Sequence, residues 1–81
     1  MRELQTGVAE GRLRIAAGER PVYHATWSTT PDGSTIDVHV RELPLIHLFV
    51  PDASDVFEGA RQLIAKTLEV DPESFLVVPS G

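Results

Sequence analysis

The feature that most constrains this chain is a pair of alternating segments joined by Asp32-Gly33. The first segment is VYHATWSTT and the second is TIDVHVRE, and polar and apolar residues alternate along both. Asp-Gly between such segments is a strong signal for a tight β-hairpin, because both residues tolerate positive φ. A hairpin closed on these two residues pairs Trp27 with Val38.

This register separates the side chains of the hairpin into two sets. Because a slip of one residue would mix the sets, the pattern predicts an antiparallel pair with one buried face and one solvent-exposed face. The apolar face carries Tyr23, Ala25, Trp27, Ile36, Val38 and Val40. The polar face carries His24, Thr26, Ser28, Asp37, His39 and Arg41.

A third strand is predicted after a proline. Pro44 has no N–H to donate and favours an extended conformation at Leu43, so the second strand should end near Glu42. The segment LIHLFV at 45–50 is then a strand that is apolar on both faces except at His47. Such a strand needs cover on both sides. One side faces the helix of the domain, and the other needs a second subunit, a partner or the N-terminal arm.

An amphipathic helix is predicted between Pro51 and Asp71-Pro72. The segment DASD offers N-cap residues, and Asp55 with Glu58 has the spacing of a capping box. Gly59 inside the helix costs about 1 kcal/mol against alanine, which indicates close packing on the sheet. The segment SFLVVP forms a last short strand. The apolar stripe of the helix consists of Val56, Phe57, Ala60, Leu63, Ile64, Thr67 and Leu68.

The expected fold is α+β, with a small antiparallel sheet and one helix in the order β-β-β-α-β. This domain covers residues 21–81. Residues 1–20 form an N-terminal arm, in which RLRIAA fits a short half-buried strand and a helical turn is the alternative. A chain of 81 residues is one small domain, so we expect it to bury extra surface in a homo-oligomer or against a partner.

The composition restricts the partners and the chemistry. The net charge of −5 disfavours direct binding to nucleic acid and suits a basic protein partner; the alternative is that this charge only keeps a small domain soluble. The chain has no cysteine, which excludes thiolate chemistry and cysteine-based zinc sites. No segment approaches the roughly 20 apolar residues of a membrane span, and the first residues lack the apolar core of a secretory signal. We therefore expect a cytoplasmic protein.

The titratable side chains do not form a predicted catalytic or metal site. His24, Asp37 and His39 share the polar face of the hairpin, but their spacing does not converge as zinc ligands do. His47 lies between two apolar residues, which is typical of a buried or interface histidine. The first strand has no carboxylate for metal-dependent hydrolysis, and the acids at 52–58 are expected at a helix start. With neither a G-x-S-x-G motif nor a phosphate-binding glycine loop, we expect no enzyme activity and no cofactor.

From the hairpin onwards, the sequence VRELPLIHLFVPDASDVFEGARQLIAKTLEVDPESFLVV resembles the HicB-like antitoxin domain. In that family a V-x-E-L-P-G turn leads to a short strand and then to a helix that opens with acidic residues. Actinobacterial members are also similar in A-R-x-x-I-A, here residues 60–65, and in L-x-V-D-P-x-S-F-x-V, here residues 68–77. The resemblance covers residues 21–79. Leu45 stands where the family usually has glycine, and Arg41 stands where proline or a small residue is common.

The resemblance implies a partial RNase-H-like domain that lacks catalytic acids. Such domains bind a small basic toxin of the HicA type, which cleaves mRNA, and they block its site; they commonly self-associate. Many add a C-terminal DNA-binding module, but this sequence stops at Gly81 directly after the last strand, so we expect no promoter binding.

The expected mechanism is occlusion of a basic RNA-binding site by acidic and apolar surface. The alternative is an orphan, phage-encoded or regulatory, that acts as a homo-oligomeric adaptor without a toxin. A hydrolase is disfavoured by the missing carboxylate on the first strand. The candidate partner contacts are His24, Asp37, His39, Asp52, Asp55 and Glu58, with Leu45 and Phe49 as apolar anchors.

Overall fold

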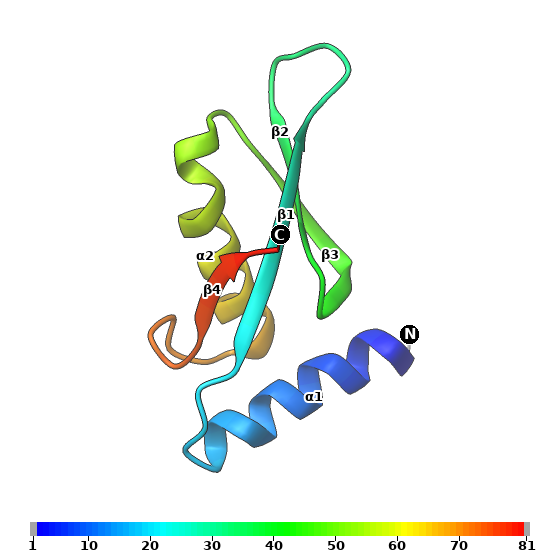
Figure 1. Ribbon diagram of the computed structural model, residues 1–81. Helices are drawn as coiled ribbons and strands as arrows, with labels where there is room; N and C mark the ends of the chain where they lie inside the picture. Colours follow the sequence, from blue (N-terminus) through cyan, green and yellow to red (C-terminus); the bar gives the residue numbers. More distant parts are fainter. Residues whose placement is uncertain (1, 81) are drawn as a thin grey trace.

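The computed structural model describes residues 2–80, with side chains described for residues 7–44 and 46–80. The strands in this part of the chain form a four-stranded sheet in the order β3-β2-β1-β4 (Figure 1). Helix α2 packs on one face of the sheet, and α1 lies across one end of it. The α+β class is therefore confirmed. The elements are α1 (Arg2–Ala16), β1 (Val22–Thr29), β2 (Ile36–Val40), β3 (Leu43–Val50), the 3-10 turn η1 (Ala53–Asp55), α2 (Val56–Leu68) and β4 (Leu76–Pro79).

The hairpin of β1 and β2 has the predicted register. Trp27 pairs with Val38 in an antiparallel ladder, and the Thr30 N–H donates to the Thr35 carbonyl at 3.0 Å where the ladder ends. Gly33 has φ of 74°, the conformation for which glycine is favoured. The Asp32 carboxylate accepts the Ser34 backbone N–H at 3.1 Å. These bonds fix the turn and thereby assign each side chain to a face.

The predicted apolar face of the hairpin packs beneath α2. Tyr23, Ala25, Val38 and Val40 are at most 4% exposed. Trp27 is different, since 41% of it is exposed where its ring meets Phe57 edge-on, with ring centroids 5.3 Å apart. The rest of the core comes mainly from Leu43, Val50, Val56, Ala60, Ile64, Ala65, Leu68 and Phe75.

Strand β3 begins earlier than predicted and contains a bulge. Val40 pairs with Leu43 across a two-residue turn, whereas the neighbouring His39 pairs with His47. Residues 44–46 therefore project from the ladder between these two pairs. A bulge is one of the few places in a sheet where a proline fits, because Pro44 has no N–H to contribute to the ladder.

Helix α2 agrees with the predicted stripe, but its start differs from the predicted capping box. Asp55 occupies the N-cap position without a side-chain hydrogen bond to the helix, because η1 already bends the chain there. A Cβ on Gly59 would lie 2.9 Å from Leu48 Cδ1, which confirms close packing on the sheet. The helix ends at Glu69, which has φ of 59°, and the Val70 N–H donates to the Ala65 carbonyl at 3.0 Å.

The expectation of a wholly antiparallel sheet is wrong for β4. This strand runs parallel to β1, with Val22 opposite Leu76 and Ala25 opposite Pro79. The reason is the crossover through α2, which returns the chain to the end of the sheet where β1 starts. The Leu76 N–H donates to the Pro21 carbonyl, and the Ser80 N–H donates to the Ala25 carbonyl. Backbone N–H groups point alternately to the two sides of a strand. The nitrogen of Pro79 therefore points to the free edge of β4, where the proline leaves no N–H for another strand.

The expected N-terminal strand is also wrong, because Arg2–Ala16 is a helix. Gly7 and Gly11 lie four residues apart and share one side of α1. A Cβ on Gly11 would lie 2.7 Å from Leu68 Cδ2, and one on Gly7 would lie 3.1 Å from the Glu42 carbonyl oxygen. These glycines allow α1 to pack closely against α2 and the start of β3. Gly18, with φ of 88°, ends the helical segment.

Candidate protein-binding surface

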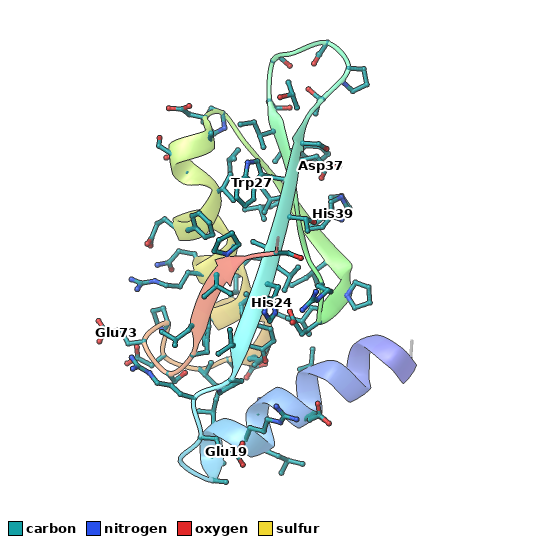
Figure 2. The ribbon with its side chains drawn as sticks, viewed as in Figure 1. Glu19, His24, Trp27, Asp37, His39 and Glu73 are labelled. Carbon is teal, nitrogen blue, oxygen red and sulfur yellow. The ribbon has the colours of Figure 1, made fainter. Side chains whose placement is uncertain are left out.

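The sheet face that points away from α2 is open over β2 and β3. Thr26, His39, His47 and Phe49 are all exposed on this face. Figure 2 shows Asp37 and His39 projecting away from α2, whereas Trp27 projects towards it. Because α1 packs across the end of the sheet, the described part of the arm does not supply the second cover that the sequence of β3 requires.

Four side chains on the open face form a contiguous group, which we call the Asp37 cluster: Asp37, His39, His47 and Phe49. His39 lies opposite His47 in the ladder, and Asp37 lies opposite Phe49. The two imidazole rings stack with centroids 5.3 Å apart and planes 25° apart. The Phe49 ring stands edge-on to His47 at 5.6 Å and is part of a residue that is 57% exposed. The cluster therefore presents aromatic surface beside one carboxylate.

The two carboxylate oxygens of Asp37 differ in their surroundings. Oδ2 lies 3.0 Å from His39 Nε2. Oδ1 is buried and accepts no hydrogen bond from the residues that the structure describes. A buried acceptor without a donor costs about 1–3 kcal/mol. Oδ1 is therefore closed to a partner, and Oδ2 is the oxygen of this 30% exposed side chain that a donor can reach.

His24 belongs to a different group on the same sheet. Its backbone N–H donates to Glu42 Oε1 at 2.8 Å, and its Nδ1 contacts Glu42 Oε2. Arg41 Nε lies 3.8 Å from Glu42 Oε2. Burial raises the pKa of Glu42, but the hydrogen bonds from His24 outweigh it and leave this pKa below its ordinary value. His24 therefore holds the turn between β2 and β3 and is only partly available to a partner.

The acidic residues at the start of α2 lie beyond the end of β3. Asp52, Asp55 and Glu58 are all exposed. Ser54 Oγ donates to Asp52 Oδ2 at 2.9 Å, and Gln62 Nε2 donates to Glu58 Oε2 at 2.7 Å. These bonds are local and leave the carboxylates open to solvent. The segment is a negatively charged rim that follows directly from Phe49 and Val50 along the chain.

The structure brings together only some of the predicted contact residues. Asp37, His39 and Phe49 are neighbours, whereas His24 is bound to Glu42. The three acids near α2 form a separate rim. Leu45 lies in the bulge of β3, and its side chain is outside the described residues.

Sequence reasoning did not include His47 in this surface, because its apolar neighbours are typical of a buried residue. In the structure His47 is exposed. The signal that identifies it is the pairing of β2 with β3, which places it opposite His39.

The geometry of the Asp37 cluster is unsuited to a metal ion. Ligands of a metal ion must direct their lone pairs towards one point. The two imidazole planes are nearly parallel, so their nitrogens do not point towards a common centre. Within residues 2–80, no group of three His, Asp or Glu side chains is placed to hold a metal ion.

A second surface lies beside β4, on the other side of the sheet. A groove of about 250 Å³ runs between α2 and this strand. Trp27, Phe57 and Leu76 are 41%, 37% and 43% exposed. Trp27 and Phe57 form an apolar pair on the α2 side, whereas Leu76 lies opposite Val22 on the other face of the sheet. The lining of the groove consists of Phe57, Glu58, Arg61, Phe75, Leu76 and Val77.

No family model, curated protein or solved structure matches this chain. The resemblance to the HicB-like domain therefore depends on the short motifs of the sequence, and any function drawn from it is a proposal. Neither helix of the described residues combines the length and the apolar character needed to cross a membrane.

Proposed function

We propose that this chain is a non-catalytic protein-binding domain of the HicB antitoxin type. Its partner would be a small basic mRNA interferase of the HicA type, held in the cytoplasm and blocked by occlusion. The observation that carries this proposal is the open face over β2 and β3. It presents the Asp37 cluster, and the separate acidic rim of Asp52, Asp55 and Glu58 follows β3 along the chain at η1 and the start of α2. The β-β-β-α-β order of the elements from β1 to β4 supports the family resemblance.

Charge and shape both favour a basic protein as the partner. A net charge of −5 attracts a cationic surface and repels nucleic acid. Phe49 is 57% exposed and supplies an apolar anchor on the edge strand β3 of this face. A toxin docked here would have its RNA-binding surface covered by carboxylates that take the place of phosphates.

The decisive experiment uses the reading frame next to the one that encodes this chain. The small basic protein encoded there is produced with and without the chain, and mRNA cleavage is measured at increasing molar ratios. We expect cleavage to stop near equimolar chain, with a stable complex in size-exclusion chromatography. Undiminished cleavage at excess chain, or a neighbouring frame whose product does not cleave RNA, would rule out the antitoxin role.

The second candidate function is a homo-oligomeric adaptor without a toxin. It is favoured by the partly exposed pair of Trp27 and Phe57, since exposed apolar side chains gathered on a small domain mark an interaction site. Light scattering of the purified chain tests it. We expect an oligomer that Phe57→Glu dissociates and that Leu13→Glu, at an exposed site on α1, leaves intact. A monomer at all concentrations would exclude this function.

A further inference from the structure

We infer that the Asp37 cluster is a recognition site for an arginine side chain of a partner protein. This inference deepens the proposed function and rests on it for the basic character of the partner. The site is defined by Asp37 and His39 on β2 and by His47 and Phe49 on β3. It accounts for two observations together, namely a carboxylate on the open face and the exposed aromatic rings next to it.

The carboxylate requires a cationic ligand with N–H donors. Asp37 Oδ2 lies 3.0 Å from His39 Nε2 and can accept a second hydrogen bond. Oδ1 is closed to a ligand, so the donor approaches Oδ2 of this side chain, which is 30% exposed. Arg41 lies in the turn after β2, and its guanidinium lies 3.8 Å from Glu42 and does not neutralise Asp37.

The rings select a guanidinium over an ammonium group. A guanidinium is planar and weakly hydrated, so it can lie against an aromatic ring while its edge donates to a carboxylate. Phe49 lies directly opposite Asp37 in the ladder, which places a ring and a carboxylate at neighbouring positions on one face. An ammonium group is compact and strongly hydrated, so it gains less than a guanidinium from lying against a ring. A metal ion is unsuited, because the stacked imidazoles do not converge.

The first experiment titrates the purified full chain with N-acetyl-arginine amide and observes the ring and amide signals by NMR. We expect saturable shifts confined to the Asp37 cluster. N-acetyl-lysine amide should bind at least several-fold more weakly. Equal shifts with both compounds, or shifts spread evenly over the acidic surface, would show a non-specific charge effect and overturn the inference.

Matched variants localise the site. Asp37→Asn keeps the shape and removes the charge, and it should weaken the arginine probe by about tenfold, as expected for loss of a charge-assisted hydrogen bond. Glu73→Gln removes the same charge from an exposed position far from the cluster (Figure 2) and should leave the affinity unchanged. Phe49→Leu keeps an apolar side chain and removes the ring, and it should weaken binding several-fold. Since Phe49 is largely exposed, this variant tests the site even where Asp37→Asn disturbs folding.

The outcome for the inference can be separated from that for the proposed function. If the chain inhibits the neighbouring ribonuclease and Asp37→Asn binds it with undiminished affinity, the arginine site is wrong and the antitoxin role stands. If the arginine probe binds in an Asp37-dependent manner but the ribonuclease is not inhibited, the antitoxin role is wrong and the arginine site stands.

Discussion

At the scale of single residues, Glu42 makes the most concentrated set of polar contacts. Its carboxylate accepts the His24 backbone N–H and contacts the His24 ring, and Arg41 is nearby. Although burial raises its pKa, these hydrogen bonds lower it overall. A carboxylate with a lowered pKa in the folded state stabilises the fold above its unfolded pKa and loses this contribution as the pH falls through the folded pKa.

We therefore predict that Glu42→Gln lowers the free energy of unfolding by about 1 kcal/mol at neutral pH. The difference from the wild type should shrink as the pH falls below about 4.5, the ordinary pKa of a glutamate. Urea unfolding followed by tryptophan fluorescence at several pH values measures this. Glu73→Gln, at an exposed site, is the control and should follow the wild-type curve. A constant difference at every pH would contradict the assigned role.

Glu69 has a backbone conformation whose cost in free energy can be tested. It ends α2 with φ of 59°, a region that disfavours a side chain and suits glycine. We predict that Glu69→Gly raises the free energy of unfolding by up to about 1 kcal/mol. Glu69→Gln is the control, because it removes the exposed ion pair with Arg12 and keeps the strained conformation. Equal effects of the two substitutions in thermal unfolding would show that strain is not released.

At the scale of elements, local patterns predicted the hairpin and α2, and tertiary contacts decided the rest. The Asp-Gly turn and the alternation around Trp27 define their own register, so the positions of Asp37 and His39 on the open face followed from the sequence. The bulge at 44–46 interrupts the alternation of β3, which is why His47 could not be assigned to that face. For the N-terminal arm the sequence left a short strand and a helical turn open, because Gly7 and Gly11 weaken a helix locally and favour it only through packing.

The close packing of α1 predicts that a larger residue at one of its glycines destabilises the fold. Gly11→Ala improves helix propensity, yet its new methyl group would meet Tyr23 and Leu68. We expect a net loss of about 1–3 kcal/mol, as for overpacked cores. Leu13 is 70% exposed, so Leu13→Ala should change the free energy of unfolding by less than about 0.5 kcal/mol. If Gly11→Ala is as stable as the wild type in urea, α1 does not pack as described.

At the scale of the whole molecule, the acidic rim and the Asp37 cluster should affect binding in different ways. Exposed charges such as Asp52 and Asp55 act mainly on the association rate, whereas a partly buried carboxylate acts on the dissociation rate. We predict that Asp52→Asn with Asp55→Asn slows association with the basic partner several-fold and reduces its salt dependence. Asp37→Asn should instead speed dissociation. Surface plasmon resonance at two salt concentrations separates these effects, and identical kinetic changes would contradict the division.

Pro79 has a consequence for how copies of this domain can accumulate in a cell. A short outermost strand that carries a proline on its free side is a poor template for strands added from other molecules. The fold thus limits the growth of fibrils by strand addition at this edge.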